Sequence, residues 1–108
     1  MKLTNSQKIQ NRLRNKFLKK GVKMISPETI FFSKQTKIGK NVTIEPYVVL
    51  SEKVIVGNNV KIYSFSHLEN VKIENSVSVG PFARLRPGTL LKSGSKAVSY
   101  THLTLPTT

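Results

Sequence analysis

The 108-residue sequence contains no cysteine and no tryptophan, and its five acidic residues are all glutamates. The absence of cysteine excludes disulfide bridges, thiolate zinc sites and cysteine nucleophiles. With 38% hydrophobic and 7% aromatic residues, the chain can build an aliphatic core but has few large aromatic anchors. No apolar run approaches the ~18 residues of a membrane-spanning helix, and the amino terminus shows no secretory signal pattern. These absences predict one small cytoplasmic domain.

The scarcity of acid leaves a large positive charge. Eighteen Lys and Arg residues against five glutamates give a formal net charge of +13 at pH 7. Eight of the basic residues lie between positions 2 and 23, where there is no acid, so binding of a nucleic-acid backbone is one alternative. The segment lacks a series of interleaved aromatic residues for base stacking, which favours a solvated helix face.

Residues 1–21 are predicted to form a helix. Ser6 can cap its start, and Gly21 can adopt the left-handed conformation that ends a helix. Its apolar residues recur at helical spacing: Ile9, Leu13 and Phe17. Because this apolar stripe is narrow and surrounded by basic residues, we expect a linker helix that docks on a missing domain or a neighbouring chain.

From about residue 30 the periodicity changes to six. Aliphatic residues occupy every sixth position, and the period resumes after one skipped residue: Ile38, Ile44, Leu50, Val56, Ile62 and Leu68, then Ile73, Val79, Leu85 and Leu91, with Phe32 one period upstream. A second column of small or branched residues lies four positions after the first: Val42, Val48, Val54, Val60, Val77, Ala83, Thr89 and Ser95.

A short strand followed by a tight corner produces a six-residue repeat, and three such strands close one triangular turn. Residues that tolerate a left-handed backbone lie where corners are expected: Gly39, Asn41, Gly57, Asn58, Asn59, Asn70, Asn75 and Gly80. The pattern predicts an all-β parallel β-helix of about three coils. The alternative, a small antiparallel sandwich, would place turn signals at about 8 to 12 residues.

Several motifs add a family resemblance. The run Gly80-Pro81-Phe82-Ala83-Arg84-Leu85-Arg86-Pro87-Gly88, with Ile44-Glu45-Pro46, resembles the hexapeptide-repeat, left-handed β-helix acyltransferases. Within that family it is similar to the bifunctional UDP-N-acetylglucosamine pyrophosphorylases / glucosamine-1-phosphate N-acetyltransferases of bacteria. Pro27-Glu28-Thr29 and Phe65-Ser66-His67-Leu68-Glu69 resemble the alphaproteobacterial branch. The resemblance covers residues 10–96.

The resemblance implies an enzyme that acetylates glucosamine 1-phosphate with acetyl-CoA and uridylylates the product to UDP-N-acetylglucosamine for cell-wall and outer-membrane glycans. It implies a homotrimer with Mg in the uridylyltransferase half, a sugar phosphate and a nucleotide sugar as ligands, and no membrane or nucleic acid as partner. Residues 1–21 correspond to the linker helix and residues 22–96 to part of the left-handed β-helix acetyltransferase domain, so we expect a fragment without the uridylyltransferase domain.

The resemblance assigns substrate binding to Arg86, at the position that holds the sugar phosphate. A guanidinium suits this task because its planar donors bind phosphate oxygens bidentately. Arg84 is expected to face solvent or a neighbouring coil. His67 is expected to be structural, and two histidines without further ligands form a poor metal set. No catalytic residue of the family is found, so the chain alone is expected to be inactive.

Residues 97–108 have neither the repeat nor a counterpart in the family. Residues 98–107 match the translation of a codon string that resembles a sequencing-library adapter, so this segment is predicted to be a non-native tail. The coils would then end uncapped, and an open β-helix end exposes unpaired strand edges. The fragment alone is therefore expected to aggregate or to exchange strands between copies.

Two alternatives remain, a free-standing hexapeptide-repeat scaffold or trimerisation module and a basic nucleic-acid binder. A gel-shift titration at two salt concentrations separates them. Nucleic-acid binding through the basic helix would lose affinity steeply with salt, whereas a scaffold would bind weakly at both concentrations.

Overall fold

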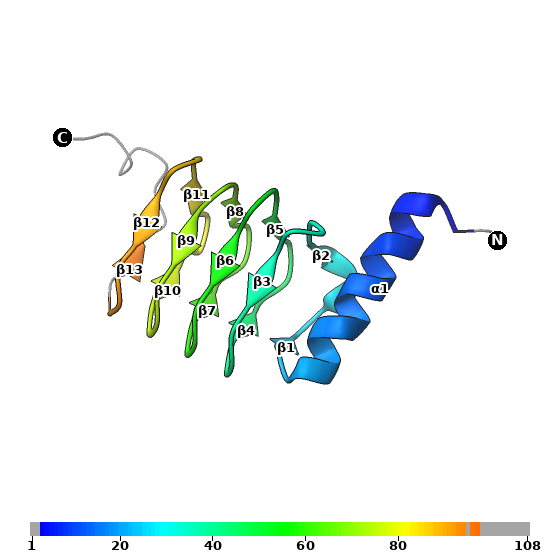
Figure 1. Cartoon of the computed structure of the whole chain (residues 1–108), viewed down its shortest axis with the longest axis horizontal. Helices are drawn as coiled ribbons and strands as arrows, with labels where there is room; N and C mark the ends of the chain where they lie inside the picture. Colours follow the sequence, from blue (N-terminus) through cyan, green and yellow to red (C-terminus); the bar gives the residue numbers. More distant parts are fainter. Residues whose placement is uncertain (1–2, 95, 98–108) are drawn as a thin grey trace.

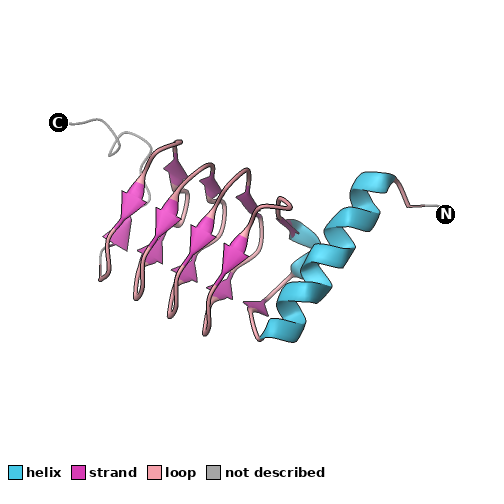
Figure 2. Ribbon diagram, viewed as in Figure 1, coloured by secondary structure: helices cyan, strands magenta, loops and turns pink. Residues whose placement is uncertain are grey.

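The computed structural model describes residues 3–94 and 96–97. One helix, α1 (Asn5–Lys20), is followed by a solenoid of short strands whose turns stack side by side (Figure 1). The helix lies across the end of the solenoid where the chain enters it (Figure 2). A short 3-10 helix, η1 (Pro27–Thr29), lies in the first turn.

The described strands form three parallel sheets. Sheet A contains β1 (Lys23–Met24), β4 (Thr43–Ile44), β7 (Lys61–Ile62), β10 (Ser78–Val79) and β13 (Lys96–Ala97), in that order. Sheet B contains β2 (Ile30–Phe31), β5 (Val48–Leu50), β8 (His67–Leu68) and β11 (Arg84–Leu85). Sheet C contains β3 (Lys37–Ile38), β6 (Ile55–Val56), β9 (Lys72–Ile73) and β12 (Leu90–Leu91).

Three strands, one from each sheet, make one turn of the solenoid. The prediction of an all-β parallel β-helix is confirmed, but it has four turns, with β13 continuing into a fifth, where about three were expected. The period varies slightly between turns. Thr43 pairs with Lys61 eighteen residues on, and Lys61 pairs with Ser78 seventeen residues on. The first turn is longer, pairing Lys23 with Thr43, because it contains η1.

The two predicted columns form the core. The members of the first column from Phe32 to Leu85 are buried, and Leu91 is half-buried. In the second column all the predicted valines and Ala83 are buried and Thr89 is half-buried, whereas Ser95 lies outside the described residues. Ser66 and Val71, which belong to neither predicted list, are also buried. Aliphatic side chains from successive turns therefore pack on one another along the whole described solenoid.

The corners only partly follow the prediction. Asn41, Asn59, Asn70 and Gly80 have positive φ, as expected. The prediction of a left-handed backbone is wrong for Gly39, Gly57, Asn58 and Asn75, which do not have positive φ.

Two of these four residues, Asn58 and Asn75, instead connect successive turns through their side chains. The Asn58 Oδ1 accepts a hydrogen bond from the Lys40 N–H at 2.7 Å, and the Asn75 Oδ1 accepts one from the Asn58 N–H at 2.8 Å. Glycine is required at position 57 because a Cβ there would lie 2.6 Å from the Asn75 Oδ1.

The predicted helix is present, but its first residue differs from the expectation. Thr4, rather than Ser6, is the N-cap and forms a reciprocal capping box with Gln7. Ser6 lies inside the helix. Gly21 ends the helix with a φ of 101°, as predicted.

The helix does not require a missing domain or a second chain to cover its apolar stripe. Leu13 and Phe17 are buried against the first turn of the solenoid, where the Phe17 and Phe32 rings lie 4.7 Å apart. The Gln10 side chain pairs with both the N–H and the carbonyl of Phe32, at 2.9 and 2.7 Å. Helix α1 therefore covers the outer edge of the first turn, at the end of the solenoid opposite the one that is expected to be uncapped.

Arg14 and Lys20 extend this cap. The Arg14 guanidinium donates to the carbonyls of Ile30 and Glu28, at 3.0 and 3.2 Å, and Lys20 donates to the carbonyl of Ile38. Partial burial lowers the pKa of Arg14, and the nearby Glu28 carboxylate opposes this shift. Three polar side chains of one helix thus bind carbonyls or N–H groups along the first turn.

The predicted tail begins at Ala97, and residues 98–108 lie outside the described residues. Ala97 itself pairs with Val79 in sheet A, so the strand register continues through this residue.

The helix cap predicts the effect of a Gln10→Ala substitution. Because the Phe32 N–H and carbonyl would lose their partners in a partly buried position, the free energy of unfolding should fall by about 1–3 kcal/mol. Hydrogen exchange at the Phe32 amide should accelerate. Arg12→Ala, at an exposed position of the same helix, is the matched control. Unchanged exchange in the Gln10 variant would contradict the proposed cap.

The close contact between turns predicts a second effect. A Gly57→Ala methyl would meet the Asn75 Oδ1 at 2.6 Å and the Glu74 backbone carbon at 2.9 Å. Forced overpacking of this kind costs about 1–3 kcal/mol, so the midpoint of thermal unfolding should fall by about 4 °C or more. The exposed corner substitution Lys40→Ala should leave the midpoint almost unchanged, and an equal fall in both variants would contradict the steric explanation.

Candidate functional site

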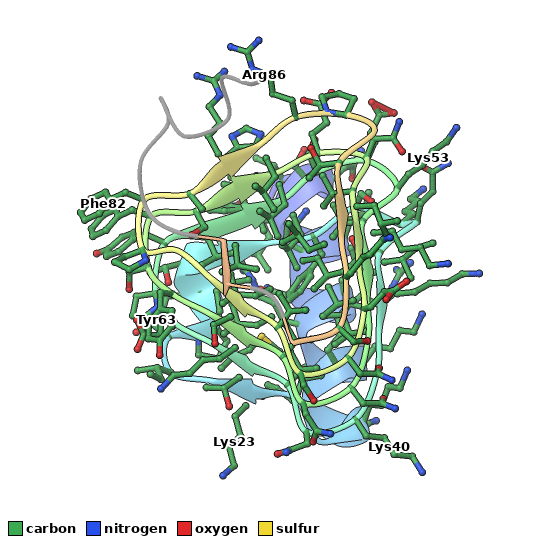
Figure 3. The ribbon with its side chains drawn as sticks, turned by 90° about the vertical axis from the view of Figure 1, so that its left-hand side faces the viewer. Lys23, Lys40, Lys53, Tyr63, Phe82 and Arg86 are labelled. Atoms are coloured by element: carbon green, nitrogen blue, oxygen red, sulfur yellow. The ribbon has the colours of Figure 1, made fainter. Side chains whose placement is uncertain are left out.

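Arg86, the predicted substrate-binding residue, lies directly after β11 at the corner that leads from sheet B to sheet C. A tight turn fixes its backbone, since its carbonyl accepts hydrogen bonds from the Thr89 N–H at 3.2 Å and from the Thr89 hydroxyl at 2.7 Å. Gly88 adopts a φ of 89° within this turn, and its N–H donates to the Asn70 carbonyl at 2.8 Å. The side chain of Arg86 is exposed and extends away from the solenoid (Figure 3).

The same turn borders a groove of about 630 Å³ on the outer side of sheet C. Gly88 and Thr89, from the Arg86 turn, line one end of it. Apolar residues from three successive turns line it as well: Ile55, Val71 and Leu90.

Three lysines give this groove its charge. Lys37 and Lys72 lie in the outward-facing positions of β3 and β9, and Lys53 lies at the neighbouring corner. All three side chains are exposed. Asn70 and Gln35 add amide groups. An apolar floor with a cationic border suits a ligand that carries phosphate.

The fold can be compared with known proteins. Residues 35–70 match the family model described as "Bacterial transferase hexapeptide (six repeats)". The chain is 45% identical over 94 residues to the "Bifunctional protein GlmU" of Zymomonas mobilis subsp. mobilis, covering 87% of this chain and 21% of the relative.

The chain therefore carries the hexapeptide repeat of bacterial transferases and is similar over most of its length to proteins named "Bifunctional protein GlmU". Two further relatives with the same name show the same similarity. The protein of Azorhizobium caulinodans is 46% identical over 86 residues, which cover 80% of this chain and 19% of the relative. The protein of Paramagnetospirillum magneticum is 49% identical over 80 residues, which cover 74% of this chain and 18% of the relative. The matched region therefore spans about a fifth of the length of these relatives.

The other residues named from the sequence are spread over this hexapeptide-repeat solenoid. Arg84 and His67 are neighbours in sheet B, in paired outward-facing positions, and both are exposed. His67 thus lies outside the core, on the sheet face that precedes the Arg86 corner. His102 lies outside the described residues.

The groove lysines were missed by the sequence reasoning. Lys37 and Lys72 each precede an inward-facing isoleucine of the six-residue column, Ile38 and Ile73. The period therefore predicts that they face outward. Only the stacking of turns shows that they lie on the same sheet, separated by the Ile55 position.

No cluster of three or more His, Asp or Glu side chains that could hold a metal occurs within residues 3–94 and 96–97. Mg²⁺ prefers carboxylate and other oxygen ligands, so this part of the chain does not fit the Mg²⁺ that the resemblance implies. None of the helices in the described part of the chain is long and apolar enough to cross a membrane.

Proposed function

We propose that this chain is part of an enzyme that transfers an acetyl group from acetyl-CoA to glucosamine 1-phosphate, and whose other domain couples the product to UTP, giving UDP-N-acetylglucosamine. The similarity to proteins named "Bifunctional protein GlmU" supports this proposal. In the proposed protein, residues 1–21 are the linker helix and residues 22–96 belong to the acetyltransferase domain. The complete protein would be a cytoplasmic homotrimer that supplies cell-wall and outer-membrane glycan synthesis.

Arg86 carries the substrate-binding part of the proposal. Its exposed guanidinium can donate two parallel hydrogen bonds to the phosphate of glucosamine 1-phosphate. The turn from Arg86 to Thr89 fixes the Cα from which the side chain extends. This limits the backbone ordering that binding would otherwise cost. The positive border of the adjoining groove supports the same ligand class.

Under the same proposal, this chain alone does not catalyse acetyl transfer. Acetyl transfer needs a general base that accepts the proton of the attacking amine, together with donors for the developing oxyanion. Arg86 holds the phosphate and does not accept the proton of the reacting amine, so it contributes binding and orientation of the sugar. Acetyl-CoA is the co-substrate of the complete enzyme. Mg²⁺ would belong to the uridylyltransferase half, and no step of the proposal for this chain uses it.

Calorimetric titration of the 108-residue chain with glucosamine 1-phosphate at low ionic strength tests the role of Arg86. Charge-assisted hydrogen bonds contribute about 1.5–3 kcal/mol, so Arg86→Ala should weaken binding by about tenfold or more. Arg84→Ala is the matched control, because it removes the same charge from an exposed position two residues away. Equal weakening in both variants would indicate only general charge attraction and would contradict the specific role of Arg86.

A further inference from the structure

The groove on the outer side of sheet C lies between two columns of residues. The strand column consists of the paired outward-facing positions of the four strands of this sheet: Lys37, Ile55, Lys72 and Leu90. The corner column lies two residues earlier in the second, third and fourth turns: Lys53, Asn70 and Gly88. The groove therefore runs along the axis of the solenoid and crosses all four turns.

The three lysines alternate between the two columns. Lys37 and Lys72 belong to the strand column, two strand spacings or roughly 10 Å apart, and Lys53 belongs to the corner column of the turn between them. Figure 3 shows Lys53 extending outward from the solenoid, on the side opposite Phe82. No acidic residue lines the groove, and within residues 3–94 and 96–97 none of the three ammonium groups forms an ion pair. Three cations thus border one groove, and no described carboxylate balances them.

Lys53 has an unfavourable backbone conformation. Its φ is 53°, in the left-handed region, and the equivalent residues of the next two turns are Asn70 and Gly88, whose residue types adopt this region more readily. The Lys53 side chain is exposed and forms no hydrogen bond with the described part of the chain, so contacts there do not explain a lysine at this position. Backbone strain of this kind is typical of sites that bind a ligand.

The two ends of the groove differ in polarity. Lys37 and Lys53 lie in the first two turns, whereas the fourth turn contributes only the uncharged residues Gly88, Thr89 and Leu90. Leu90 is 47% exposed, and a Cβ at Gly88 would meet no atom within 4 Å, so this end is apolar and open. Inorganic phosphate at the lysines would leave the apolar end in water. The groove fits a ligand with an anionic group at one end and a flat ring at the other.

We propose that this groove binds a nucleoside diphosphate, whose diphosphate lies among the three lysines and whose base lies against Leu90. Lysine side chains are flexible and carry compact charges, so side chains from different turns can converge on one diphosphate. Asn70 lies between the two ends, where an amide can pair with a ribose hydroxyl. The volume of about 630 Å³ is in the range of small-molecule sites. The inference does not depend on the proposed function, because Arg86 extends away from the solenoid and does not line the groove.

Calorimetric titration of the 108-residue chain with ADP and with UDP at low ionic strength tests this site. At least one of the two should bind, and Lys53→Asn should weaken its binding by about tenfold or more, because a charge-assisted hydrogen bond is lost. Asparagine tolerates a left-handed backbone, so this variant should keep the thermal midpoint of the wild-type protein. The matched control is Lys40→Asn, which removes the same charge from an exposed position at the corner between sheets C and A and should bind like wild type.

Leu90→Ser tests the apolar end of the groove. It should weaken binding of the nucleotide by about threefold or more and leave binding of inorganic pyrophosphate, which has no base, unchanged.

Three results would overturn the inference: a wild-type chain that binds neither nucleotide, equal weakening by Lys53→Asn and Lys40→Asn, and pyrophosphate that binds as tightly as the nucleotide. The second result would indicate general charge attraction, and the third a site for phosphate alone. The titration of glucosamine 1-phosphate with Arg86→Ala uses another ligand and another side chain, so failure of the proposed function and failure of this inference are distinguishable.

Discussion

The register between successive turns is the constraint on which the structure depends. Each turn must return its inward residues to the same position above the previous turn, because the backbone N–H and carbonyl groups of one strand pair with the next turn and the aliphatic side chains stack in the same direction. Isoleucine, leucine and valine meet this demand with flat, branched surfaces that pack between turns. The asparagine contacts at the corner between sheets C and A reinforce the same register, and glycine at positions 39 and 57 gives them room.

The first turn of the solenoid has no preceding turn, so the backbone N–H and carbonyl groups on its outer edge have no strand to pair with. Helix α1 supplies these partners with side chains rather than with another strand. Gln10 acts on Phe32 as a strand would, donating to its carbonyl and accepting from its N–H, while Arg14 and Lys20 bind carbonyls farther along the turn. The helix thereby removes a strand edge that could otherwise pair with another molecule. Its basic residues have two roles, because some bind the first turn and others remain in solvent.

The features that depend on periodicity, which are the buried columns and the parallel β-helix, could be predicted from the sequence. The columns from Phe32 to Leu85 were assigned correctly because an inward-facing position admits few residue types. The corners were harder, since asparagine fits both a left-handed backbone, as at Asn59, and an ordinary backbone whose side chain binds the preceding turn, as at Asn58. The partner of α1 could not be identified, because its apolar stripe fits a neighbouring domain as well as the first turn. The groove could not be predicted from the sequence either, because its lysines come from different turns, and the sequence alone does not show which residues of different turns lie side by side. The substrate-binding role of Arg86 stays a prediction that came from the motif around it.

The six-residue repeat is one residue shorter between Leu68 and Ile73, and the structure places this deletion at one corner. Two residues, Glu69 and Asn70, connect Leu68 to Val71 at the corner between sheets B and C, whereas three residues connect the corresponding positions in the turns before and after. The shorter corner contributes Asn70 and Val71 to the wall of the groove beside Arg86. Corner length can therefore change without disturbing the stacked core, because the strands on either side keep their partners. Insertions and deletions of single residues at the corners offer evolution a way to reshape the surface of the solenoid while its interior stays the same.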